Sequence, residues 1–135
     1  MAADALNEPL AFRASIGGFL GSSFSVEWQD DQLLYEGWDH GVQTAWKRVR
    51  PTEARWRRFW DKCDELRVWD WLPEYRPEFF VTDGTSWELE IVSTRGKAHS
   101  GGSNAYPPSG EEEESKEFRA FCRAVGTLVG GTPFH

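Results

Sequence analysis

"PTEARWRRFWDKCDEL", residues 51–66, is the stretch that decides the fold. Thr52 is a residue type that caps helix N-termini, and Glu53 follows where the helix dipole favours a carboxylate. The spacing of the apolar side chains predicts an amphipathic helix with one stripe packed on a core. The stripe consists of Trp56, Phe59, Trp60, Cys63 and Leu66.

A second stripe of the same kind lies near the end of the chain. Its spacing predicts another amphipathic helix, and Gly130-Gly131 predicts where that helix ends. Ser109 and Gly110 precede the run Glu111–Glu114, and we expect these carboxylates at the N-terminus of the helix. The apolar side chains of the stripe are Phe118, Phe121, Cys122, Val125 and Leu128.

The first fifty residues alternate apolar and polar side chains, which is typical of strands. Turn residues separate four such segments, and together they predict an antiparallel meander. The segments are 10–21, 23–28, 33–38 and 42–49. Several tryptophans fall on apolar faces, so we expect them in the core. They are Trp28, Trp46, Trp56, Trp60 and Trp87.

Further strands are predicted around "FFVTDGTSWELEI", residues 79–91. The pair Asp83-Gly84 is a strong signal for a tight hairpin turn. After this turn apolar side chains alternate with Glu88 and Glu90, which gives the strand one dry face and one wet face. We place His99 on the strand that follows, beside the two carboxylates.

Because strands arrive in antiparallel groups and do not alternate with helices, the sequence predicts an α+β fold. We expect an antiparallel sheet of about five to seven strands with both amphipathic helices packed on one face. A chain of 135 residues is long enough for one core. The expected organisation is a lead-in over residues 1–9, a single domain over 10–130 and a C-terminal tail over 131–135.

The formal net charge of −7 argues against a nucleic-acid partner, because phosphate binding needs a basic surface. An excess of basic residues over 47–67 is interpreted as a solvated helix face, with self-association or an anionic partner as the alternative. The sequence predicts no membrane segment. Without a signal-peptide pattern, and with Cys63 and Cys122 on apolar stripes, a cytoplasmic location is predicted.

The loop "SGGSNAYP", residues 100–107, is the first candidate site. Its glycines permit close backbone approach, and Asn104 and Tyr106 are able to hydrogen-bond a small polar ligand. The same composition is typical of a structural connection, which we favour. Glu88, Glu90 and His99 are further candidates, but they are too few for a predicted metal site. Neither a cofactor nor a catalytic residue is predicted.

The segment "VWDWLPEY", residues 68–75, is the second candidate site. Trp69, Trp71 and Tyr75 lie outside a regular helix or strand, and with Trp38 they are able to line a groove. Such a segment either fills the edge of the core or forms an exposed contact surface for another protein. The sequence leaves both alternatives open.

"FWDKCDELRVWDW", "VTDGTSWELEI" and "SGGSNAYP" together resemble a group of small, uncharacterised bacterial proteins. The resemblance covers about residues 47–128, and the order of the three motifs is more specific than any one of them. It implies a compact α+β fold and carries over no catalytic residue. In size and style the chain is also similar to short products of mobile gene cassettes.

The sequence therefore favours a non-enzymatic binding or adaptor domain that uses an aromatic patch or the exposed sheet face. A small-molecule binder or enzyme with its pocket at the "GSNAYP" loop is one alternative. A self-associating structural protein is the other, since a homo-oligomer is compatible with the pattern. The identity of the protein partner or small ligand stays open.

Overall fold

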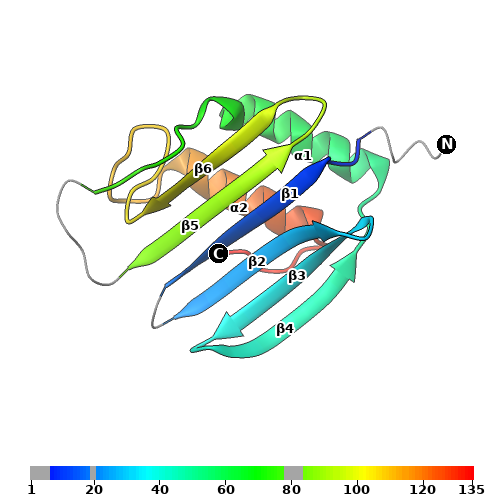
Figure 1. Ribbon diagram of the computed structural model, residues 1–135, viewed down its shortest axis with the longest axis horizontal. Helices are drawn as coiled ribbons and strands as arrows, with labels where there is room; N and C mark the ends of the chain where they lie inside the picture. Colours follow the sequence, from blue (N-terminus) through cyan, green and yellow to red (C-terminus); the bar gives the residue numbers. More distant parts are fainter. Residues whose placement is uncertain (1–6, 19–20, 78–83) are drawn as a thin grey trace.

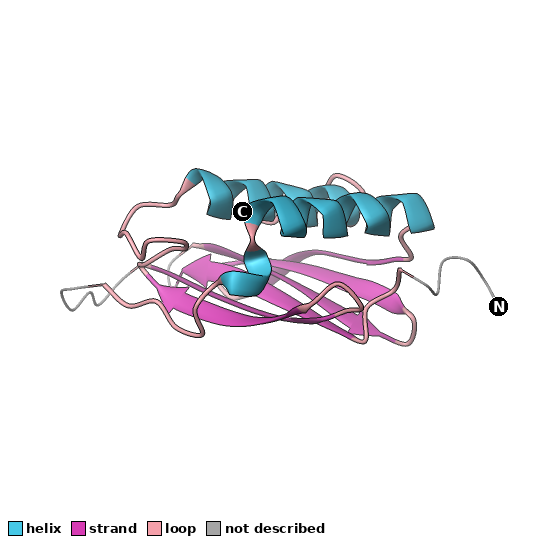
Figure 2. Cartoon of the chain, turned by 90° about the horizontal axis from the view of Figure 1, so that it is seen from above, coloured by secondary structure: helices cyan, strands magenta, loops and turns pink. Residues whose placement is uncertain are grey.

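Six strands form one antiparallel sheet, and two helices lie side by side on one of its faces (Figures 1 and 2). The computed structural model describes residues 7–18, 21–77 and 84–135. In chain order the elements are β1 (Ala11–Gly18), β2 (Ser22–Gln29), β3 (Gln32–Asp39), β4 (Val42–Val49), α1 (Glu53–Leu66), the short 3-10 helix η2 (Val68–Asp70), β5 (Thr85–Val92), β6 (Lys97–Ser103) and α2 (Lys116–Leu128). The predicted α+β class and the helices on one face are confirmed.

The strand order across the sheet is β4-β3-β2-β1-β5-β6. The first four strands form the predicted meander, and β5 then pairs with the free side of β1. β6 follows β5 as its antiparallel neighbour. β5 thus lies between β1 and β6, while residues 79–82 and Asp83, where a strand and half of the hairpin turn were predicted, lie outside the described residues.

The core fills the space between the helices and the inner face of the sheet. Trp56 of α1 is fully buried, and Phe118 of α2 is 2% exposed. The ring centroid of Trp56 lies 5.3 Å from that of Trp60 and 5.7 Å from that of Trp28. Because large aromatic rings bury much area each, these contacts supply a large share of the core.

The first helix begins and ends much as its sequence predicts. The Thr52 hydroxyl accepts a hydrogen bond of 3.2 Å from the Arg55 backbone N–H, as an N-cap residue does. Arg67 ends the helix in the left-handed conformation, with φ of 57°, and its N–H bonds back to the Asp64 carbonyl.

The second helix begins later than predicted. Its N-cap is Ser115, so Glu111–Glu114 precede the helix and do not form its first turn. The Tyr106 N–H donates to the Glu111 carbonyl at 3.0 Å, which ties this segment to the preceding loop. The Ser115 hydroxyl accepts from the Phe118 N–H and donates to the Pro107 carbonyl. The loop contacts therefore set the start of the helix.

The prediction that Trp46 belongs to the core is wrong. Trp46 is 62% exposed, and Val42 on the same strand is 66% exposed. β4 is the edge strand, and a register shift at Gly37/Trp38 breaks its alternation. Trp46 lies opposite Glu36, on the sheet face away from the helices. Neither helix covers that face, so the Trp46 ring remains in water.

The residues after α2 return to the sheet. Phe134 is 4% exposed, and the Tyr35 hydroxyl donates to the Pro133 carbonyl at 2.5 Å. This contact covers part of the inner face at β3. Within the part of the chain that the structure describes, no helix has the length and apolar character needed to cross a membrane.

Tryptophan-to-alanine changes at positions 56 and 46 compare a tryptophan of the core with one on the surface. We expect Trp56→Ala to lower the free energy of unfolding by about 3–5 kcal/mol, because it leaves a cavity among aromatic rings. In dilute solution Trp46→Ala should change it by no more than about 0.5 kcal/mol, since the ring is mostly in water. Chemical denaturation measures both values, and equal losses would contradict the surface position of Trp46.

Candidate functional site

The outer face of the sheet, opposite the helices, brings several charged side chains together. Glu90 lies opposite Arg13 of β1 and His99 of β6, so the three share this face. Arg13 Nη2 lies 3.9 Å from Glu88 Oε1 and 3.7 Å from Glu90 Oε2. The predicted grouping of Glu88, Glu90 and His99 on one wet face is confirmed.

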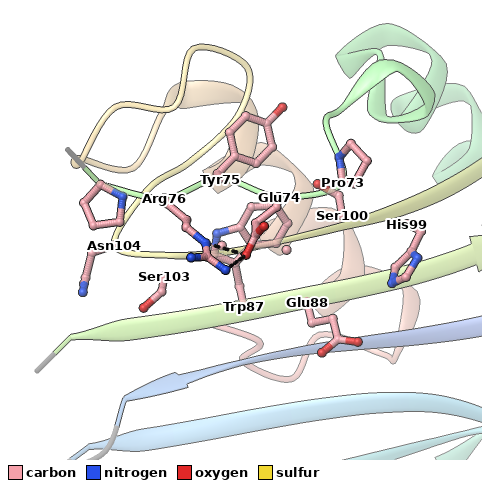
Figure 3. Close-up of a pocket in the computed structure, with 13 residues that line it drawn as sticks. Pro73, Glu74, Tyr75, Arg76, Trp87, Glu88, His99, Ser100, Ser103 and Asn104 are labelled. Atoms are coloured by element: carbon pink, nitrogen blue, oxygen red, sulfur yellow. Dashed lines mark hydrogen bonds and ion pairs between the residues drawn. The ribbon is translucent and has the colours of Figure 1, made fainter. Parts of the chain in front are cut away.

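An open depression of about 860 Å³ lies at the β6 side of this face. It is bounded by β6 and the start of its following loop, by the segment 73–77, and by two residues of β5, Trp87 and Glu88. Figure 3 shows Glu88 and His99 projecting from β5 and β6, and Arg76 on the segment 73–77, where it forms an ion pair with Glu74. The depression therefore has basic, acidic and neutral polar groups in its wall.

The segment 73–77 lies here because it covers the edge of β6. The Tyr75 N–H donates to the Gly101 carbonyl at 2.8 Å, and the Gly101 N–H donates to the Pro73 carbonyl at 3.1 Å. The Ser103 N–H donates to the Tyr75 carbonyl at 3.3 Å. These bonds satisfy backbone groups that an edge strand otherwise leaves to water or to another chain.

Of the two alternatives for "VWDWLPEY", the structure shows that the aromatic residues are mostly buried. Trp71 is 7% exposed and Tyr75 is 4% exposed, so an exposed aromatic patch built on them is wrong. The Tyr75 hydroxyl accepts from the Leu72 N–H at 2.9 Å. Trp69 is half-buried, and its indole N–H donates to Asp64 Oδ1 at 2.7 Å. The segment fills the edge of the core.

The "GSNAYP" loop holds the beginning of β5. Asn104 is in the left-handed conformation, with φ of 54°, and its Oδ1 accepts from the Thr85 N–H at 3.1 Å. Its own N–H donates to the Thr85 carbonyl at 2.9 Å. A Cβ on Gly102 would lie 2.5 Å from the Ala105 carbonyl oxygen, so glycine is required there. These contacts support the structural interpretation of the loop.

The structure thus gathers only some of the candidate residues. Glu88, His99, Asn104 and Tyr75 line the depression, while Glu90 lies on the same sheet face beside it. Tyr106 is 4% exposed and packs on Phe118 with ring centroids 4.9 Å apart. Burial raises the pKa of Tyr106. The other candidates, Trp69 and Trp71, pack on the core and do not line the depression.

Two basic residues of this surface were not singled out from the sequence. Arg13 is a polar position in an alternating strand, and Arg76 lies between two prolines. Alternation predicts that Arg13 faces water, but only the pairing of β1 with β5 places it opposite Glu90. The sequence carries no signal for that pairing.

The described residues offer little for nucleophilic or metal chemistry. Burial raises the pKa of the Cys122 thiol to about 12, and it also raises that of Cys63. Both thiols are therefore protonated near neutral pH and are poor nucleophiles. Among these residues no group of three His, Cys, Asp or Glu side chains is placed to hold a metal ion. The outer face is suited to hydrogen bonds and ion pairs.

A second concave surface, of about 630 Å³, lies between the two helices on the far side of the molecule. Arg55, Arg58 and Lys62 of α1 line it together with Arg123 of α2. The three arginines are exposed, and for Arg55 and Arg58 this agrees with the interpretation of the basic stretch 47–67 as a solvated helix face.

A comparison with known protein families finds no match for this chain, and a comparison with curated proteins finds none either. The resemblance to small bacterial proteins and to gene-cassette products stays a prediction.

Substitution of Asn104 tests whether the loop is scaffolding. Asn104→Ala removes the acceptor for the Thr85 N–H and places a side chain that disfavours positive φ, so we expect a loss of about 1–3 kcal/mol in the free energy of unfolding. Asn104→Gly removes the same acceptor but tolerates the conformation, so its loss should be smaller. Urea denaturation ranks the variants, and an Asn104→Ala protein as stable as wild type would refute the structural role.

The contact between Trp69 and Asp64 predicts a pH effect. The hydrogen bond from Trp69 is the largest cause of the lowered pKa of Asp64, opposed by burial and assisted by Arg95. Because the folded pKa lies below the unfolded value of about 3.9, ionised Asp64 stabilises the fold above that pH, and this contribution is lost as the pH falls through the folded pKa.

We therefore expect Trp69→Phe to raise the pKa of Asp64 towards its ordinary value and to shift acid unfolding to higher pH. Carboxyl carbon NMR shifts followed against pH measure the pKa directly. An unchanged pKa would show that the indole N–H has no influence on this carboxylate.

Proposed function

We propose that this protein is a non-enzymatic binding domain that contacts another protein through the outer face of its sheet. The observation that carries the proposal is the position of α1 and α2 on the same face, so that no helix of the described residues lies over the opposite face (Figure 2). Trp71 and Tyr75 are buried, so the exposed sheet face is the surface that remains for contact.

The charged groups of this face are available for a ligand. Arg13, Glu88 and Glu90 have side chains between 43% and 56% exposed, and their ion-pair distances are 3.7 and 3.9 Å. Exposed ion pairs of this kind contribute only about 0–1 kcal/mol, so exchanging them for contacts with a partner costs little. Two acidic residues beside an arginine and a histidine favour a partner surface that carries both signs of charge.

The backbone beneath these side chains is held in place before binding. β5 is paired on both sides, and the segment 73–75 is bonded to the edge of β6. Binding a partner therefore requires little ordering of the backbone, and this low entropy cost favours affinity. Trp46 adds an exposed aromatic ring at the opposite margin of the same face.

A small-molecule binder is the second candidate. The depression of about 860 Å³ has the size of a ligand site, and Glu88, His99 and Asn104 are in its wall. The depression is open to solvent, whereas most small-molecule sites enclose their ligand, and this difference favours a protein partner. The predictions of a cytoplasmic location and of bacterial origin stay predictions.

Isotope-labelled protein mixed with a size-separated extract of the source cells distinguishes the two candidates. We expect the macromolecular fraction to perturb the NMR signals of the β5 and β6 amides. Glu88→Lys should weaken the purified interaction at least about tenfold, because reversing a charge that the partner buries costs several kcal/mol of binding free energy. The matched control is Glu65→Lys, which reverses an exposed charge on α1.

Perturbation by the small-molecule fraction alone would favour the second candidate. Equal weakening by Glu65→Lys, or perturbations confined to α1 and α2, would refute binding through the outer face.

A further inference from the structure

The two edges of the sheet differ in how they are protected. At one edge, Pro73 and Tyr75 bond to the backbone of β6. At the other edge, β4 has β3 as its neighbour and no further strand among the described residues. An eight-residue strand therefore keeps one side of its backbone available for pairing.

β4 is also the most exposed strand in the sheet. Val42 and Trp46 lie on it, and they are two of the four large apolar residues that the described part of the chain leaves exposed. Figure 1 shows β4 at one margin of the sheet, while both helices lie behind the sheet and nearer to its opposite edge. Apolar side chains on a bare edge strand are the combination that pairs with another chain.

We propose that β4 pairs antiparallel with β4 of a second copy, so that two six-stranded sheets join into one. This goes beyond the proposed function, because it uses the edge of the sheet and leaves Glu88, Glu90 and His99 of both copies open. A two-fold axis perpendicular to the sheet relates the copies, and next to this axis opposed residues have their side chains on the same face, as far as the irregularity at Thr44.

The register that fits best places Trp46 opposite Trp46 of the second copy. Moving the axis to residue 47 would oppose two lysines, and like charges directly opposite each other are destabilising. Moving it to residue 45 would bring the irregular position Thr44 next to the centre. With the axis at Trp46, the central pairs lie on the regular side of the bulge, and the two rings shield each other from water.

The basic residues of β4 weaken this association, because both copies bring positive charge to the contact. In the proposed register Lys47 faces Ala45 and Arg48 faces Thr44, so no like charges are directly opposed. The two edges nevertheless carry the same sign of charge. Salt screens that repulsion, so the dimer should become stronger as ionic strength rises.

Cysteine cross-linking tests the register. Directly opposed residues of an antiparallel pair have Cα atoms about 4.5–5.5 Å apart, within the range of a disulfide. Cys63 and Cys122 are 1% and 2% exposed, so they do not compete with an introduced surface thiol. Under mild oxidation Trp46→Cys should form a covalent dimer, whereas Leu72→Cys, at a residue 56% exposed and distant from β4, should not.

A mixture of Ala45→Cys and Lys47→Cys proteins, at positions opposed in this register, should also cross-link, and each alone should cross-link far less. Sedimentation velocity supplies a measurement without oxidation: the wild-type chain should dimerise, and Trp46→Lys should remain monomeric at the same concentration. A wild-type monomer, equal cross-linking by Leu72→Cys, or a dimer that persists in Trp46→Lys would overturn the proposal. Because Trp46 is exposed, its replacement leaves folding intact, which circular dichroism checks.

Discussion

The contact between the aromatic stripes of the two helices and the inner face of the sheet is the constraint on which the rest of the structure depends. Trp56 packs against Phe12 of β1 and Trp28 of β2, and Phe118 packs against Trp87 of β5. Since both stripes are buried on the same side, one sheet face is occupied and the other has no helix over it. A helix on the outer face would cover the surface proposed for binding another protein.

The same arrangement explains why one edge of the sheet is covered and the other is exposed. α1 ends near β6, and the chain after it runs along the edge of that strand before returning as β5. This path buries Trp71 and Tyr75 and also forms one wall of the depression. At the opposite margin the C-terminal residues cover β3 and leave β4 exposed. One edge is thus closed by backbone bonds, while the other is available to a second chain.

The site could be predicted only in part. Alternation placed Glu88, Glu90 and His99 on one wet face, and the composition of "SGGSNAYP" indicated a structural loop, which the bonds between Asn104 and Thr85 support. Arg13 and Arg76 could not be assigned to this surface, because their neighbours come from strands and loops distant in sequence. The same limit applies to Trp71 and Tyr75, whose burial depends on the edge that their segment covers.

The sequence by itself determined the local elements: two amphipathic helices, the meander, and the alternation of β5. These follow from the periods of 3.6 and 2 residues, which the backbone imposes on any segment that buries one side. The tertiary structure alone decided that β5 joins β1, that α2 begins at Lys116, and that Trp46 lies in water. Burial is a property of neighbours, and alternation alone does not reveal the irregularity in β4 that leaves Trp46 on the face away from the helices.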